Sequence, residues 1–123
     1  MAKSKVQIAA EHLRKAQTEA EAGDLSDAVQ WCFASLEAAI DALAEPRGLP
    51  IDQKHWQRRA AASRLHAEGV LPKDLAPLHD KLNEIRKGVF YEGEDPDLEG
   101  EAIDDILSDV EVAVSVARGE ASR

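Results

Sequence analysis

Apolar residues recur every three or four positions along most of this chain, and that spacing constrains its fold more than any other feature. The clearest run lies within residues 73–91 and consists of Leu75, Leu78, Leu82, Ile85 and Val89. Such steps place side chains on one face of an α-helix, because a helical turn holds 3.6 residues. The sequence shows no strand-like alternation of apolar and polar residues. It therefore predicts an all-α protein.

The same spacing predicts five helices, at about residues 4–22, 25–45, 52–68, 73–91 and 98–118. Gly23 is a candidate left-handed cap for the first helix, and Asp24 is a candidate N-cap for the second. A link this short predicts that the two helices pack as an antiparallel hairpin. The third helix has few apolar positions, so we expect it at the edge. The fold class expected is a four-helix up-and-down bundle with a short additional helix.

Length and composition agree with one small globular domain spanning residues 1–123. The chain has a mass of 13.4 kDa and is 44% hydrophobic and 32% charged. Its single cysteine, Cys32, lies on an apolar stripe, which predicts a core residue and excludes an internal disulfide. No apolar run approaches the ~20 residues that a membrane helix needs, and the first residues lack the apolar stretch of a signal peptide. We therefore expect a cytoplasmic protein without a membrane partner.

Charge is unevenly distributed along the chain. The formal net charge is −9, and residues 92–111 contain ten acidic residues but no lysine or arginine. This balance argues against general DNA binding, which needs clustered cations. A local basic patch is formed in sequence by Lys54, Arg58, Arg59 and Arg64. It is either a solvated helix face or a local cleft that touches a nucleotide or a short RNA.

The spacing of potential metal ligands and nucleophiles is uninformative. None of the four histidines, His12, His55, His66 and His79, forms an i, i+4 pair with an intervening glutamate. We expect each histidine at a surface or edge position, and we expect no metal and no other cofactor. The acidic residues after position 91 do not follow the ligand order of an EF-hand. Cys32 has no adjacent base in the sequence that would activate it.

The segment from Asn83 to Tyr91 contains the most informative polar residues. Asn83 and Arg86 fall on a helix face next to the one that Leu82 and Ile85 occupy. An arginine there can offer a planar set of donors to a phosphate or a carboxylate. The predicted ligand-binding residues are Asn83, Arg86, Lys87 and Tyr91. In the alternative interpretation, Arg86 pairs with acidic residues of the second or fifth helix and Tyr91 closes the end of the bundle.

Three stretches resemble HEPN domains, small prokaryotic helical bundles often encoded beside a minimal nucleotidyltransferase. They are Gly23-Asp24-Leu25, the stretch 38–43 followed by Gly48, and Leu82-Asn83-Glu84-Ile85-Arg86 with Tyr91 five residues later. The resemblance covers nearly the whole chain, and the Asn-x-x-Arg element is its distinctive part. It implies a HEPN-like bundle, a homodimer and a nucleotidyltransferase-type partner protein.

The resemblance also bears on activity. HEPN proteins that cleave RNA use an arginine and a histidine separated by four to six intervening residues, paired across a homodimer without metal. The arginine falls on Arg86, but Tyr91 occupies the first candidate position for the histidine, and no histidine follows His79. A tyrosine hydroxyl keeps its proton well above neutral pH, so it is a poor general base.

The leading hypothesis is thus a non-catalytic HEPN-like domain. It would bind a nucleotide, an RNA or a partner protein through a cleft around Asn83 and Arg86. One alternative is a metal-independent endoribonuclease of a toxin–antitoxin type, with Arg86 and either Tyr91 or a histidine from elsewhere as catalytic residues. The other is a purely structural assembly subunit whose acidic residues 92–111 meet a basic partner.

Overall fold

The computed structural model describes residues 3–122 apart from residues 53, 94 and 99, and the side chains of residues 90–92 are likewise not described. Within this part of the chain the regular structure is entirely helical, and the predicted all-α fold is confirmed. The helices are α1 (Lys5–Glu21), α2 (Leu25–Ala44), a short 3₁₀ helix η1 (Glu45–Arg47), α3 (His55–Ala67), α4 (Ala76–Glu92) and α5 (Ile103–Ala121).

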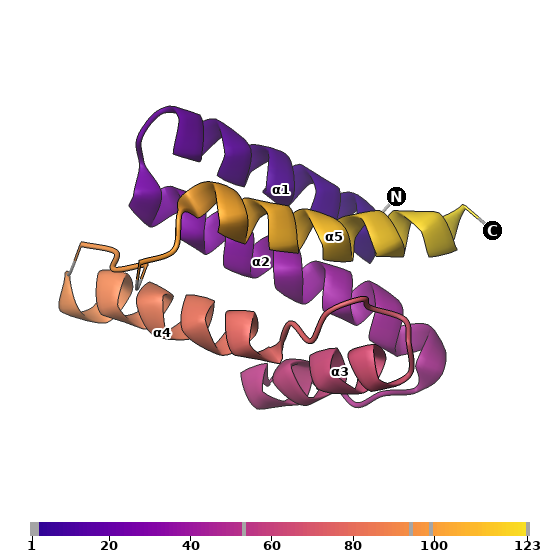
Figure 1. The fold of residues 1–123 in the computed structure, drawn as a ribbon. Helices are drawn as coiled ribbons and strands as arrows, with labels where there is room; N and C mark the ends of the chain where they lie inside the picture. The colour runs from indigo at the N-terminus through magenta and orange to yellow at the C-terminus, as the bar shows by residue number, and fades with distance from the viewer. Residues whose placement is uncertain (1–2, 53, 94, 99, 123) are drawn as a thin grey trace.

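Four long helices form a bundle, and the short α3 lies at its edge (Figure 1). Helices α1 and α2 make an antiparallel hairpin, α5 packs on both of them, and α4 packs on α2. Helix α3 contacts α2 and α4. The two ends of the chain lie at the same end of the bundle (Figure 1). Because α3 and α4 both pack on α2, residues from these three helices meet in one region.

The turn between α1 and α2 has the local structure that its sequence predicts. Gly23 has φ +81°, in the left-handed region that glycine adopts without a steric penalty. The Oδ1 atom of Asp24 accepts a hydrogen bond of 3.0 Å from the backbone N–H of Asp27. This bond satisfies one of the free N–H groups at the start of α2. The hairpin is therefore specified by local chemistry as well as by packing.

Three helices, α3, α4 and α5, begin later than the sequence pattern predicts. Helix α3 begins at His55 and not at residue 52. Helix α4 begins at Ala76 with Pro77 in its first turn, where the missing N–H of proline is harmless. Helix α5 begins at Ile103 and not near residue 98, because Gly100 lies between them with φ +84°, a conformation that cannot continue a right-handed helix.

The core is built mainly from alanine and branched aliphatic side chains. The largest fully buried ones include Leu36, Ile40, Leu43, Leu82 and Ile106. A buried polar group in this region, the Ser35 hydroxyl, donates a hydrogen bond of 2.7 Å to the carbonyl oxygen of Ala9. Cys32 is fully buried, and burial raises the pKa of its thiol to about 12. The prediction that Cys32 is a core residue is confirmed.

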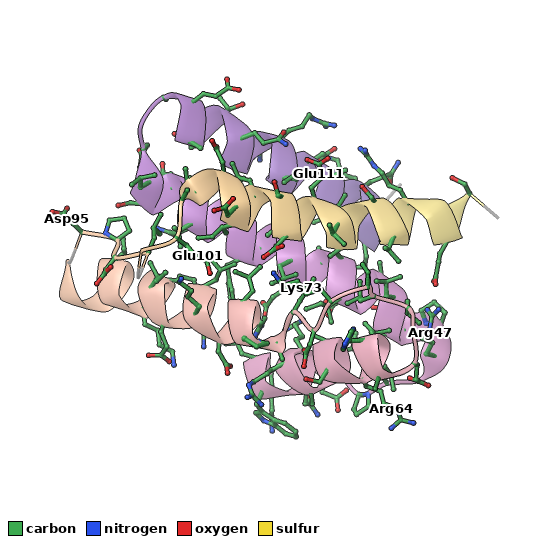
Figure 2. All side chains as sticks on the ribbon, in the orientation of Figure 1. Arg47, Arg64, Lys73, Asp95, Glu101 and Glu111 are labelled. Atoms are coloured by element: carbon green, nitrogen blue, oxygen red, sulfur yellow. The ribbon has the colours of Figure 1, made fainter. Side chains whose placement is uncertain are left out.

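Ion pairs tie segments that are distant in sequence to α5. Arg47, at the end of η1, pairs with Glu120 near the end of α5. Lys73, in the segment before α4, lies 2.9 Å from the Asp109 carboxylate of α5. Both basic residues are labelled in Figure 2. Among the described helices, none is both long enough and apolar enough to cross a membrane.

Candidate functional site

Arg86 is half-buried on α4 and is not neutralised by a carboxylate of the described residues. Its Nη2 atom donates a hydrogen bond of 3.0 Å to Oδ1 of Asn83, one turn earlier on the same helix. Its Nε atom is buried without a hydrogen-bond partner. Of the two interpretations of Arg86, the ion pair with α2 or α5 is not found within the part of the chain that the structure describes.

The other residues of the predicted ligand set differ in what they offer. Asn83 is half-buried and already bonded to Arg86. Lys87 is exposed, and its Nζ atom lies 3.5 Å from a carboxylate oxygen of Glu84. Tyr91 belongs to the last turn of α4, but its side chain lies outside the described residues. The structure thus brings Asn83 and Arg86 together and leaves Lys87 on the adjacent surface.

The buried ring of Phe33, on α2, connects Arg86 to two histidines. The guanidinium carbon of Arg86 lies 5.0 Å from the centroid of the ring, within the range of a cation–π contact. The rings of His55 and His79 lie 5.2 and 5.1 Å from the same centroid. Side chains from α2, α3 and α4 therefore meet around one aromatic ring.

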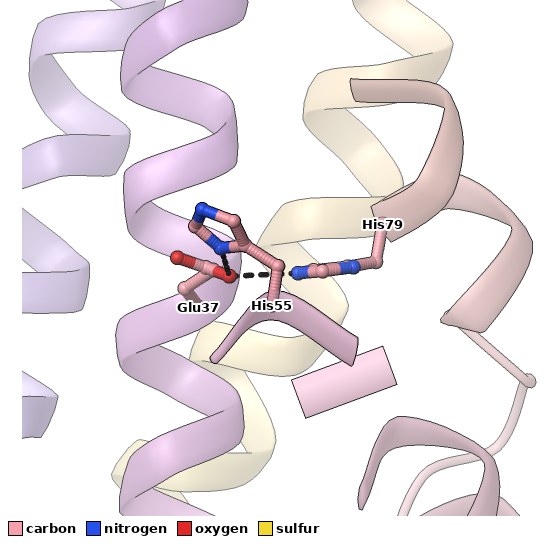
Figure 3. A group of neighbouring side chains, drawn as sticks. All are labelled: Glu37, His55 and His79. Carbon is pink, nitrogen blue, oxygen red and sulfur yellow. Dashed lines mark hydrogen bonds and ion pairs between the residues drawn. The ribbon is translucent and has the colours of Figure 1, made fainter. Parts of the chain in front are cut away.

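The two histidines share a carboxylate. Nδ1 of His55 and Nε2 of His79 each lie 2.8 Å from Oε2 of Glu37, as Figure 3 shows. The side chain of His79 is 1% exposed, that of Glu37 14% and that of His55 42%. The expectation of surface or edge positions is wrong for His79, because its side chain extends from α4 and is buried against α2. We call Glu37, His55 and His79 the Glu–His–His group.

The environment of Glu37 favours its charged form. Burial alone raises the pKa of this carboxyl, but the hydrogen bonds with His79 and His55, together with the charge of Arg58, outweigh burial and lower the pKa below its ordinary value. Nη1 of Arg58 lies 3.9 Å from Oε1 of Glu37. Glu37 is therefore an anion in a largely enclosed position.

Arg58 belongs to a second buried pair next to this group. Its Nε and Nη2 atoms donate hydrogen bonds of 2.8 and 3.0 Å to the two carboxylate oxygens of Asp41. The hydrogen bond to Asp41, and the charges of Asp41 and Glu37, raise the pKa of Arg58 despite its burial. Lys5 lies 3.7 Å from Asp41 on the solvent side. The charge of Arg58 is thus compensated inside the protein.

The remaining members of the predicted basic patch are distributed over α3 and its start. Arg59 pairs with Asp80 of α4, and Arg64 pairs with Glu68 one turn further along α3. Arg64 lies on the outer side of α3 (Figure 2). Lys54 is exposed just before α3. Each of the three arginines faces a carboxylate, so the positive field of this stretch is weaker than its sequence suggests.

The acidic stretch 92–111 is partly neutralised as well. Lys73 pairs with Asp109, and Lys81 lies 3.3 Å from a carboxylate oxygen of Glu101. Both lysines come from α4 or the segment before it. The described part of this stretch therefore presents a smaller net negative charge than its sequence suggests.

The Glu–His–His group is the part of the site that the sequence reasoning missed. Spacing along the sequence can reveal metal ligands that lie on one helix, whereas these three residues come from three helices. A weak signal existed in the sequence. Glu37 and Asp41 are acidic residues one turn apart in the mostly apolar second half of α2, and His79, Asn83 and Arg86 follow steps of four and three along α4.

Comparison of the chain with protein-family models, with curated proteins and with solved structures gave no match. The resemblance to HEPN domains therefore depends on the sequence features given above.

Proposed function

We propose that this protein is a HEPN-like, non-catalytic binding domain that recognises a nucleotide or a short RNA through Arg86. The observation that carries the proposal is the state of this arginine. Its guanidinium is half-buried, its Nε atom has no hydrogen-bond partner, and no carboxylate of the described residues pairs with it. Asn83 orients the guanidinium, and Lys87 supplies a second positive charge nearby.

An unpaired donor of this kind is expensive in a folded protein. A guanidinium carries five N–H donors, and a buried donor without a partner costs about 1–3 kcal/mol. A phosphate oxygen that reached this position would supply the missing acceptor and the missing countercharge. The cation–π contact with Phe33 holds the guanidinium in place before the ligand arrives.

The charge distribution limits the size of the ligand. A protein of net charge −9 repels a long polyanion, and the arginines on α3 already face carboxylates. A nucleotide or a few RNA residues needs only a local positive site. The same charge balance argues against general DNA binding, and a cytoplasmic location agrees with the ligands proposed.

The resemblance to HEPN domains adds two proposals about assembly. The protein would be a homodimer in which both Arg86 side chains lie near the shared seam. A nucleotidyltransferase-type protein would be its partner. Both proposals depend on the Asn-x-x-Arg element and on the order of the helices.

The binding proposal is tested by calorimetric titration with nucleoside mono- and triphosphates and with a short single-stranded RNA. Arg86→Ala removes charge-assisted hydrogen bonds worth about 1.5–3 kcal/mol, so we expect binding to weaken about 10- to 100-fold. Arg59→Ala is the matched control, because it removes one exposed arginine from the neighbouring helix. Equal binding by the wild type and Arg86→Ala, or no binding by either, would refute the proposal.

A second candidate function, metal-independent RNA cleavage, is favoured by one observation. His55 and His79 pack on the same ring as Arg86, so histidines distant in sequence lie in the region where the family histidine is missing. A neutral imidazole can act as a general base. Incubation with structured and unstructured RNA in a chelator tests it. Cleavage that both Arg86→Ala and His55→Ala abolish would replace the non-catalytic proposal.

A further inference from the structure

We propose that Glu37, His55 and His79 form a binding site for a single divalent transition-metal ion of the zinc type. The side chains come from α2, α3 and α4, and each offers one ligand atom. These three atoms all lie within 4.8 Å of one another. The inference uses none of the residues that carry the proposed binding function, so the two proposals can fail independently.

The distances are those of a site that needs little movement to bind an ion. Zinc binds histidine nitrogen and carboxylate oxygen at about 2.0–2.2 Å, so two ligand atoms of a tetrahedral site lie about 3.3 Å apart. The two nitrogen atoms lie 2.8 Å from Oε2 of Glu37. A bound ion requires each of these contacts to widen by about 0.5 Å and the two nitrogen atoms, which lie within 4.8 Å of each other, to reach about the same separation. Rotation of the partly exposed His55 side chain supplies such a movement.

The ligand types select the class of metal. Two imidazoles and one carboxylate suit zinc and its transition-metal neighbours, whereas magnesium and calcium prefer oxygen ligands alone. Without metal, the nitrogens that face the Glu37 anion carry the hydrogens that they donate to it. The ion replaces these two hydrogens, so binding requires the proton of each neutral histidine on its outer nitrogen, Nε2 of His55 and Nδ1 of His79. The nitrogen atoms that face Glu37 then present their lone pairs to the ion.

Access and local charge both allow an ion to enter. His79 is enclosed and Glu37 nearly so, but the side chain of His55 is 42% exposed and forms the solvent side of the group. The cation that contacts Glu37, Arg58, is already held by two hydrogen bonds to Asp41. Three protein ligands leave a fourth position for water or an anionic group.

The occupied site would have a structural consequence of its own. The short α3 lies at the edge of the fold, where it packs on α2 and α4. A metal held by all three helices joins α3 to the bundle by coordination bonds. Zinc should therefore stabilise the packing of α3 in addition to whatever chemistry the open position allows.

The test uses untagged protein stripped with a chelator and then titrated with zinc chloride alone. We expect one ion per chain by calorimetry and a higher unfolding temperature with zinc. Cobalt should give the visible absorption of a four-coordinate ion with nitrogen and oxygen ligands. His55→Ala and Glu37→Gln should each weaken zinc binding about 100-fold or more. Replacing a residue that only hydrogen-bonds to a metal ligand typically weakens binding about 10- to 100-fold, and loss of the ligand itself has a larger effect.

His66→Ala is the matched control, because His66 lies on the same helix and its side chain is outside the group. It should bind zinc like the wild type, as should Arg86→Ala. Circular dichroism of each variant shows whether it is folded, and His55 is exposed enough for its replacement to be tolerated. No binding of zinc by the wild type at millimolar concentration, or binding that survives both Glu37→Gln and His55→Ala, would overturn the proposal.

Discussion

Removing one partner of the buried pair of Asp41 and Arg58 should cost far more stability than removing one partner of the exposed pair next to it. The side chains of Asp41 and Arg58 are 4% and 11% exposed, and two hydrogen bonds join them. On the next position of the same helix, Arg59 pairs with Asp80, and these side chains are 53% and 50% exposed. The chain thus provides an internal comparison between a buried and an exposed arginine–carboxylate pair.

The expected loss in the free energy of unfolding depends on whether a substitution leaves a buried charge without its partner. Asp41→Asn leaves the Arg58 charge without its main partner, and breaking a buried pair in this way costs about 3–5 kcal/mol. Glu37 stays 3.9 Å from Arg58 and compensates part of the loss, so we expect the lower end, about 3 kcal/mol. Asp80→Asn removes a solvent-screened contact and should cost less than about 1 kcal/mol.

Urea unfolding followed by circular dichroism measures both values. The double variant Asp41→Asn/Arg58→Met should be more stable than the sum of the two single changes predicts, with a coupling free energy of about 2 kcal/mol. The corresponding cycle for Asp80 and Arg59 should give a coupling near zero. Equal destabilisation by Asp41→Asn and Asp80→Asn would show that burial does not decide the strength of these pairs here.

Three further predictions follow from the core and from the proposed assembly. Burial raises the pKa of Cys32 to about 12, so at pH 8 a thiol reagent should react at negligible rate with the native protein and rapidly after denaturation; fast native reaction would contradict its burial. Leu36→Ala should lower the free energy of unfolding by about 2–5 kcal/mol in a denaturant titration, because Leu36 is fully buried among α-helices; a loss below about 1 kcal/mol would show a poorly packed core. Light scattering should find a species of twice 13.4 kDa, and a monomer at high concentration would contradict the proposed homodimer.

The sequence predicts the fold of this protein well, because the relevant information is local. Steps of three and four place the core residues of α4 on one stripe, and Gly23 with Asp24 specifies the first turn. The late starts of α4 and α5 are also local effects, of Pro77 and Gly100, but they compete with an apolar pattern that continues through them. Periodicity locates the middle of a helix better than its end.

The site was only partly predictable, for a physical reason. Arg86 and Asn83 lie one turn apart on one helix, so their proximity can be read from the sequence. Glu37, His55 and His79 are joined only by the packing of three helices, and no spacing along the chain encodes that packing. Whether Arg86 pairs with a carboxylate also depends on how the helices pack, and among the described residues it has no such pair. The sequence left both interpretations of this residue open.

The Glu–His–His group places polar side chains in the packed region between three helices, where it serves either stability or ligand binding. Replacing buried polar or ionic groups by apolar residues of similar size is often neutral or stabilising by about 1–4 kcal/mol. If the group serves a ligand, then Glu37→Met/His55→Leu/His79→Leu should unfold at the same or a higher urea concentration than metal-free wild type, while zinc binding is lost. Arg58 keeps its pair with Asp41 in this variant, so no new unpaired charge arises from it. A loss of more than about 2 kcal/mol would instead make the group a structural element, since the hydrogen bonds to Glu37 would then outweigh the packing gained.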